Sequence, residues 1–183
     1  MKAFSDELLM SKVKDGHLKF LEELFDRYQR KLYNYFVKCT QDWEESNDLT
    51  QQAFVRVMKY RHSYRSENRF EIWLFQIARN LVRDHFRKLK VHKNQLDFVE
   101  EIPDRMEEVD TDRLEKEQVL YEALAQMDPD KRELLVMAKM QGMKYEDIAQ
   151  IREISVGATK VQVHRAVARL RSIYMDLEAK HNG

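Results

Sequence analysis

Residues 145–171 read YEDIAQIREISVGATKVQVHRAVARLR, and their pattern predicts two helices joined by a turn. Apolar residues three and four positions apart predict a short helix that starts at Tyr145. A tight turn at Glu153 follows, and Ser155 is a residue type that caps helices, so a longer helix is expected to run to about Leu177. Two helices joined by a turn of about three residues form a helix-turn-helix, whose second helix enters the DNA major groove.

The predicted long helix has two different faces. One face is mainly apolar and is expected to pack on the preceding helices; it carries Val156, Thr159, Val163, Ala166, Val167, Leu170 and Tyr174. The other face carries Gly157, Lys160, Val161, His164, Arg165 and Ala168. From Ala158 to Arg171 there are four bases and no acid. A basic helix face is most often only a solvated surface, but together with the short helix and the turn it indicates contact with DNA.

The rest of the chain is also expected to be helical. Only four glycines and two prolines occur in 183 residues, so we predict an all-α protein of two small helical domains. A helical bundle is expected over 1–90, with a helix capped by Ser5 and regular apolar spacings over 20–36, 49–58 and 70–89. An acidic, flexible linker is expected over 91–111, and the helix-turn-helix domain over 112–183, where Asp128, Pro129 and Gly142 mark helix ends.

The chain shows no signal for export or for a membrane. The N-terminus carries acids at once, and no apolar run approaches the length of a membrane span, so membrane insertion is not expected and a cytoplasmic location is. The single Cys39 cannot form an internal disulfide, which agrees with a reducing compartment.

The 32 basic and 32 acidic side chains cancel over the whole chain but not along it. The net charge is +5 over 1–90, −7 over 91–127 and +2 over 128–183. Such asymmetry suggests a polyanionic partner for the two ends and a different partner for the middle, although helical surfaces often fluctuate by a few charges.

Bases and aromatic residues interleave over 60–75. This combination suits single-stranded nucleic acid, because cations follow the phosphates while rings stack on unpaired bases. Phe70 and Trp73 lie in an apolar stripe and are more often core residues than stacking platforms, so Tyr64 is the candidate expected to be exposed. Farther along, Arg79, Arg83 and Arg87 recur every four residues and form a line suited to phosphates.

Two blocks of sequence resemble bacterial sigma factors. NDLTQQAFVRVMKY (47–60), HSYRSENRF (62–70) and EIWLFQIARNLVRDHFRK (71–88) resemble the second conserved region of the sigma-70 family, and residues 127–171 resemble its fourth. The short gap between the blocks leaves no room for a third domain, which is similar to the extracytoplasmic-function (ECF) type. The resemblance implies a transcription initiation factor, not an enzyme, that binds core RNA polymerase through its beta-prime and beta subunits, directs it to promoters and assists melting.

The resemblance also implies roles for individual residues. The residues implied to contact the beta-prime subunit are Asp48, Gln51, Gln52 and Phe54. The minus-ten element would be held as a single strand with a flipped base. The residues implied to bind it are Tyr64, Arg65, Asn68, Phe70, Trp73, Arg79, Asn80, Arg83 and Arg87. The residues implied to bind the duplex minus-thirty-five element are Ser155, Gly157, Lys160, Val161, His164, Arg165 and Arg169. The acidic linker would thread the polymerase's cationic RNA path, and an anti-sigma factor is a common further partner of this type.

The sequence departs from the family pattern at informative positions. Arg152-Glu153 stand where the family usually has Leu-Gly, and the missing glycine is expected to strain or alter the turn. Lys144 replaces the usual Ser or Thr cap. Val161 replaces a commonly polar residue, and we hypothesise that it contacts a thymine methyl group.

Two other classes of protein remain as alternatives. An enzyme is disfavoured because the sequence has no glycine-rich phosphate loop, no HExxH motif and no His or Cys in metal-ligand spacing, so no metal and no cofactor are expected. A stand-alone helix-turn-helix regulator would bind duplex DNA without the polymerase. The aromatic and basic segment over 60–75 argues against it, since duplex binders do not need to hold single strands.

Overall fold

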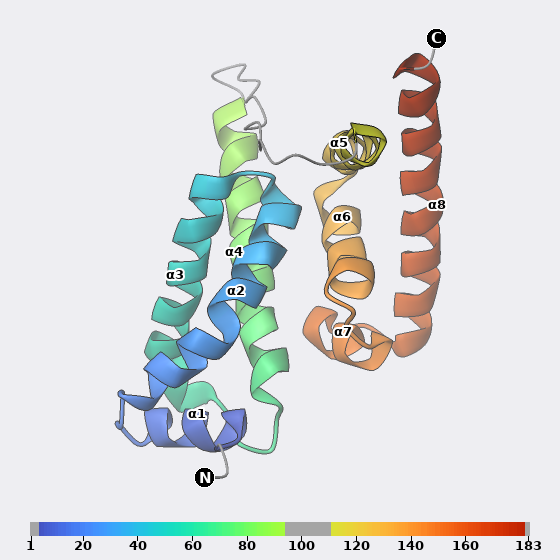
Figure 1. The fold of residues 1–183 in the computed structure, drawn as a ribbon. Helices are drawn as coiled ribbons and strands as arrows, with labels where there is room; N and C mark the ends of the chain where they lie inside the picture. The colour runs from blue at the N-terminus through green and yellow to red at the C-terminus, as the bar shows by residue number, and fades with distance from the viewer. Residues whose placement is uncertain (1–3, 94–110, 182–183) are drawn as a thin grey trace.

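The computed structural model describes residues 4–93 and 111–181, and every regular element in these two ranges is helical (Figure 1). The all-α prediction is confirmed. The first half contains α1 (Asp6–Lys14), α2 (Phe20–Thr40), α3 (Trp43–Tyr60), the 3-10 turn η1 (Arg61–Ser63) and α4 (Phe70–Lys93). The second half contains α5 (Thr111–Ala125), α6 (Pro129–Leu135), the π-helical segment η2 (Val136–Met140), α7 (Tyr145–Arg152) and α8 (Val156–His181). Most of the linker predicted over 91–111 lies outside the described residues.

Side-chain caps begin several of these helices. The Ser5 hydroxyl accepts a hydrogen bond from the backbone N–H of Leu8, as predicted for α1. Asp128 accepts from two backbone N–H groups at the start of α6, where Pro129 is the first helical residue. Asp42 caps α3 in the same manner, although the sequence analysis did not single it out. Each cap satisfies backbone donors that have no partner within the helix, and this is why the helices begin where they do.

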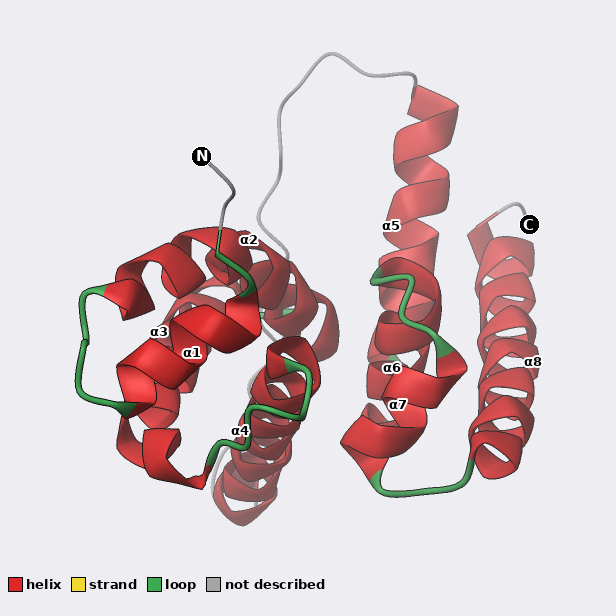
Figure 2. Cartoon of the chain, turned by 90° about the horizontal axis from the view of Figure 1, so that it is seen from below, coloured by secondary structure: helices red, strands yellow, loops and turns green. Residues whose placement is uncertain are grey.

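The first half is a bundle in which α2, α3 and α4 pack against one another and α1 crosses one end (Figures 1 and 2). The apolar stripe predicted over 20–36 is its core. The fully or nearly fully buried members are Leu24, Tyr28, Leu32, Tyr35 and Phe36. Burying such side chains contributes roughly 1.5–3 kcal/mol each, so the stripe fixes the orientation of α2 in the bundle.

The second half is packed directly on the first. The contacts join α4 to α7, and α2 to both α6 and η2. One buried apolar cluster contains side chains of both halves, with Phe75 and Ile77 from α4 and Ile148 and Ile151 from α7 among them. Figure 1 shows α6 and α7 facing the first bundle, with α8 on the outer side. The two halves therefore share a core, which the sequence pattern did not predict.

Candidate nucleic-acid interface

The helix-turn-helix lies at α7 and α8, which pack against each other. The turn between them begins at Glu153, whose backbone is left-handed with φ of 56°. This conformation favours glycine, so Glu153 adopts it at a cost of about 1–2 kcal/mol, which is the strain expected at this position. The hydroxyl of Ser155 accepts a hydrogen bond from the N–H of Ala158 at 3.0 Å and caps α8, as predicted. Lys144 makes no side-chain cap at the start of α7.

The two faces predicted for α8 are found in the structure. Thr159, Val163 and Ala166 are buried against the preceding helices. The residues expected to contact the minus-thirty-five element are all exposed, namely Ser155, Gly157, Lys160, Val161, His164, Arg165 and Arg169. Val161 is 49% exposed, which is unusual for valine and leaves its methyl groups available for an apolar contact. The exposed face of α8 is therefore cationic, with one apolar residue near its N-terminal end.

A second exposed surface lies on α3. Asp48, Gln51 and Gln52 are exposed on it, and Val55, at 57% exposure, continues the same face. Phe54 points the other way: it is 6% exposed, and its ring packs edge-on against Phe25 with centroids 4.9 Å apart. Three of the four predicted docking residues therefore share a surface, while Phe54 supports that surface from the core.

The exposure predicted for Tyr64 is wrong. Its side chain is 1% exposed because the ring packs against Trp73 and Phe70, with centroid separations of 5.2 Å and 6.2 Å. The hydroxyl donates a hydrogen bond to the carbonyl of Asn68 at 2.6 Å, and Lys14 donates one to the carbonyl of Tyr64. Tyr64 and Phe70 thus support, from the core side, the loop between η1 and α4, which is called the Tyr64 loop below. The predicted residues that this loop leaves exposed are Arg65 and Asn68, and Trp73 is partly exposed beside them.

The arginines predicted to form one line on α4 divide into two groups. Arg83, Arg87 and Asn80 are exposed and line a hollow between α3 and α4. Arg56 and Asp84 complete that hollow, and Asp84 lies 3.0 Å from Arg56 and 2.9 Å from Arg87. Arg79 is excluded from this group because its side chain is directed at the second half of the molecule and is only 15% exposed.

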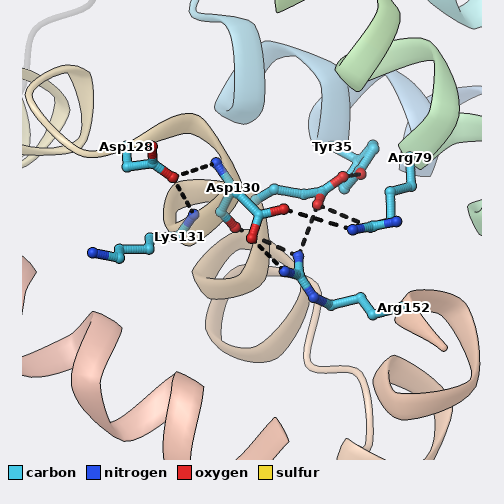
Figure 3. Close-up of polar contacts among 7 residues, drawn as sticks. Tyr35, Arg79, Asp128, Asp130, Lys131 and Arg152 are labelled. Carbon is cyan, nitrogen blue, oxygen red and sulfur yellow. Dashed lines mark hydrogen bonds and ion pairs between the residues drawn. The ribbon is translucent and has the colours of Figure 1, made fainter. Parts of the chain in front are cut away.

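Arg79 belongs to a charge cluster with Glu133, Asp130 and Arg152 (Figure 3). Glu133 and Arg152 are buried in it, Arg79 is partly buried, and Asp130 lies at its exposed edge. Arg79 Nε lies 3.3 Å from Glu133 Oε2, and Arg152 donates to the same oxygen at 2.9 Å. Arg152 also donates to Asp130 at 2.6 Å, while Arg79 lies 3.6 Å from the other oxygen of Asp130. The Tyr35 hydroxyl donates to Glu133 Oε1 at 2.8 Å. Two cations and two anions therefore balance within the cluster.

The sequence pattern does not predict this cluster. Burial raises the pKa of the Glu133 carboxyl, while Tyr35, Arg79 and Arg152 favour its charged form. The only signal in the sequence was the arginine at position 152, where the family usually has leucine. That departure now has a physical reason, since Arg152 supplies a buried cation to Glu133.

The described ranges hold no candidate metal centre. Residues 4–93 and 111–181 contain no group of three His, Cys, Asp or Glu side chains that could hold a metal ion. Burial raises the pKa of the Cys39 thiol well above its ordinary value, which disfavours the reactive thiolate. Among the described helices, none is long and apolar enough to cross a membrane.

Comparison with protein families places these surfaces in a known class. Residues 24–91 match the family model for sigma-70 region 2, and residues 117–170 match that for sigma-70 region 4. The first match contains α3, the Tyr64 loop and nearly all of α4, and the second contains the helix-turn-helix. The fold and its exposed basic helix thus define a helix-turn-helix DNA-binding protein of the transcription machinery.

Curated proteins that match this chain over most of their own length are also RNA polymerase sigma factors. The RNA polymerase sigma factor CarQ from Myxococcus xanthus is 31% identical over 92% of this chain and 97% of the relative. The ECF RNA polymerase sigma factor SigM from Bacillus subtilis is 27% identical over 84% of this chain and 94% of the relative. The chain belongs to the sigma-70 family of RNA polymerase sigma factors, in its extracytoplasmic-function group, and is a transcription initiation factor.

Solved structures share the whole fold. CnrH in complex with the cytosolic domain of CnrY is 23% identical, with a TM-score of 0.71 over 95% of this chain and 97% of that chain. The sigma factor RpoE in complex with the anti-sigma factor NepR from Bartonella quintana is 22% identical, with a TM-score of 0.66 over 83% of this chain and 94% of that chain. Both confirm the arrangement of two helical domains.

Proposed function

We propose that this protein directs core RNA polymerase to promoters through three surfaces, and that it docks, melts and reads DNA with different helices. The observation that carries this proposal is the division of α8 into a buried apolar face and an exposed face that holds every residue expected to read the minus-thirty-five element. A face with cations and no acid suits the major groove, because contacts with phosphates position the helix and contacts with base edges give sequence specificity.

The minus-thirty-five element would be read by the N-terminal turns of α8. Lys160, Val161, His164 and Arg165 recur at i, i+1, i+4 and i+5 and therefore lie on one side of the helix. Lys160 and Arg165 offer donors to guanine or to phosphates, and Val161 offers methyl groups to a thymine. Gly157 permits close approach of the backbone, and Ser155 and Arg169 lie at the two ends of this surface.

The minus-ten element would be held by the Tyr64 loop and the exposed side of α4. Arg65 and Asn68 are exposed polar residues of the loop, and the hollow that contains Asn80, Arg83 and Arg87 offers cations to the phosphates of a single strand. The partly exposed Trp73 is the ring available for a base. Tyr64 and Phe70 would act by fixing the shape of the loop.

Docking on the beta-prime subunit would use the exposed face of α3. Asp48, Gln51 and Gln52 give it polar contacts, and Val55 adds apolar area beside them. The second domain would contact the beta subunit, and the acidic linker would occupy the cationic RNA path. With α3 bound to the polymerase, the exposed sides of α4 and α8 would remain available to bind promoter DNA.

Further partners and properties follow from membership of this group. An anti-sigma factor is a partner of the related RpoE, and we propose one here that covers the docking and DNA-reading surfaces. We place the protein in the cytoplasm, where polymerase acts, and propose that it has no intrinsic catalytic activity and no cofactor. The chemistry of transcription would belong to the polymerase.

Run-off transcription with core polymerase on a genomic promoter library tests the proposal. The protein should restore transcription from a defined subset of promoters that share two spaced elements. A gel shift with and without core polymerase separates this function from that of a stand-alone regulator. Tight, specific duplex binding by the free protein, with no transcription restored to core enzyme, would favour the regulator.

A further inference from the structure

The hollow between α3 and α4, called the arginine hollow below, carries more positive charge than its own acid balances. It has a volume of about 500 Å³ and is lined by Arg56, Asn80, Arg83, Asp84 and Arg87. Asp84 is the only carboxylate among the described residues that line it, and it accepts hydrogen bonds from Arg56 at 3.0 Å and from Arg87 at 2.9 Å. Three guanidinium groups thus face one carboxylate, which leaves a net charge of +2.

Arg83 is the cation of this hollow that a ligand can bind most readily. Its side chain is exposed, and in the part of the chain that the structure describes it has no carboxylate partner. Arg56 and Arg87 are held in position by Asp84, which lies between them. A guanidinium group binds two oxygens of one phosphate at once, so the arginine hollow suits a ligand with negative charges on neighbouring phosphates.

A second hollow, called the Phe86 hollow below, adjoins the first. The two share Arg83 and Arg87, and the second has a volume of about 260 Å³ between α4 and the start of α6. Val82, Phe86 and Pro129 give it apolar walls, and the ring of Phe86 is half-buried. Apolar and aromatic walls beside a few charged groups are typical of small-molecule sites, and a planar ring packs well on phenylalanine. The Phe86 hollow therefore suits a flat heterocycle joined to the phosphates.

Charge of opposite sign lines the two walls of the Phe86 hollow. The α4 wall carries cations and the α6 wall carries acids; the cations are Arg83, Arg87 and Lys90, and the acids are Asp128, Asp130 and Glu133. A continuous DNA strand has a phosphate on each side of every base, so a strand that entered this hollow would bring a phosphate toward the acids, which repel it. A mononucleotide carries all its phosphates at one end. It can therefore place them on α4 while its base reaches α6.

Asp128 offers a carboxylate oxygen to the base. Its Oδ1 accepts the two backbone N–H groups that cap α6, while none of the described residues donates to its Oδ2. Asp130 and Glu133, by contrast, both accept hydrogen bonds from Arg152. Guanine presents its N1–H and its N2 amino group side by side, whereas adenine has an acceptor at N1, so a carboxylate favours guanine.

We infer that the two adjoining hollows form a binding site for a guanine nucleoside diphosphate. The phosphates lie on Arg83 and Arg87, the base packs against Phe86 and Pro129, and the N–H groups of the base point to Asp128. The binding itself needs neither polymerase nor DNA. Its consequence rests on the proposed function: because Arg83 and Arg87 are also assigned to the minus-ten strand, the nucleotide competes with that strand for the same two cations.

Isothermal titration calorimetry of the full chain with four ligands tests the site. GDP should bind at a single site with a Kd below about 100 μM. ADP, guanosine and pyrophosphate should each bind at least about tenfold more weakly, because each lacks the guanine donors, the phosphates or the base. No binding of GDP at about 1 mM would overturn the inference. Pyrophosphate binding as tight as that of GDP would also overturn it, since the hollows would then hold an anion only.

Two variants locate the nucleotide. Arg83→Ala should weaken GDP binding at least about tenfold, whereas Arg30→Ala, which removes an exposed arginine of α2, should leave it unchanged. Asp128→Asn keeps a residue that caps α6 but removes the charge, so it should abolish the preference for GDP over ADP. Circular dichroism checks that each variant is folded. Equal affinity in Arg83→Ala and Arg30→Ala would place the nucleotide elsewhere, and an unchanged preference in Asp128→Asn would refute the placement of the base.

A competition experiment separates the nucleotide site from the proposed function. It uses the full chain and a fluorescent single strand that carries the minus-ten element of a promoter transcribed by the wild-type protein. GDP should displace the strand at concentrations near its Kd, and ADP should require at least about tenfold more. Binding of GDP without displacement would support the nucleotide site and overturn the placement of the minus-ten strand on Arg83 and Arg87. Binding of the strand without any binding of GDP would overturn the nucleotide site alone.

Discussion

The hydroxyl of Tyr35 donates a hydrogen bond to the carboxylate of Glu133 at 2.8 Å, across 98 positions of sequence. Both groups are buried, and each lies on a helix of a different half of the molecule. A buried carboxylate persists only when it is paired and hydrogen-bonded, so this contact and the arginines beside it tie the two halves together. The relative placement of the domains is therefore specified by polar as well as apolar contacts.

The left-handed residue in the helix-turn-helix predicts a stabilising substitution. Glu153→Gly should raise the free energy of unfolding by about 1 kcal/mol, because glycine adopts the φ of 56° without the steric cost of a Cβ atom. Urea denaturation measures this change. Glu153→Ala, which keeps the Cβ atom, is the control and should give no such gain. A loss of stability in Glu153→Gly would show that the glutamate side chain compensates for its backbone.

Substitution of the exposed Val161 should change the base preference of the protein at the minus-thirty-five element. Val161→Ser should alter selection at one position of the minus-thirty-five element by about 1–3 kcal/mol, because a hydroxyl replaces the apolar contact with a thymine methyl. A promoter library read by run-off transcription measures the preference. Met175→Ser, also exposed on α8 but away from the predicted base-facing residues, should leave selection unchanged. Identical preference at every position in Val161→Ser would refute the assignment.

Arginines of the two DNA surfaces should differ in their effects. Arg83→Ala should weaken open-complex formation at many promoters alike and lower the salt slope by roughly 0.7–0.9, because it removes a phosphate contact. Lys160→Ala and Arg165→Ala should act mainly through the upstream element. Arg30→Ala, an exposed arginine of α2, serves as control. If Arg83→Ala spared open complexes but abolished upstream preference, the two domains would have been assigned the wrong elements.

Because Phe54 is buried and Gln51 is exposed, substitutions at the two positions should affect different properties of the protein. Phe54→Ala should lower the free energy of unfolding by about 3–5 kcal/mol, because it leaves a cavity against Phe25. Gln51→Ala should leave stability nearly unchanged and weaken the affinity for core polymerase, since Gln51 is exposed on α3. Thermal denaturation and a polymerase binding titration give the two quantities. Equal losses of stability in both variants would contradict the placement of Phe54 in the core.

The raised pKa of Cys39 predicts slow thiol chemistry in the folded protein. Burial raises its pKa well above the ordinary value, so at pH 8 the folded protein holds less thiolate than an exposed cysteine does. Alkylation of native protein should therefore be much slower than in denaturant. If alkylation occurs only when transient unfolding exposes the thiol, the pH dependence of the rate should follow the ordinary pKa of an exposed thiol. A native rate equal to the denatured rate would show that Cys39 is exposed.

Much of the local structure could be predicted from the sequence because its signals are short-range. Ser5, Asp128 and Ser155 cap helices through neighbours two or three positions away, and all three predictions are confirmed. The division of α8 into two faces follows from helical periodicity in the same way. The exposure of Tyr64 could not be judged by these means, since its cover comes from Trp73 and Phe70 beyond the loop.

The helices, their caps and the exposed face of α8 can be predicted from the amino-acid sequence, since each depends on residues within a turn or two of one another. Which arginines of α4 are accessible depends on how the helices pack. Arg79 and Arg83 are equivalent in spacing, yet Arg79 is partly buried against Glu133 and Arg83 faces solvent. The reason is physical: accessibility and charge pairing depend on which distant helix packs on a surface, and helical periodicity carries no information about that partner.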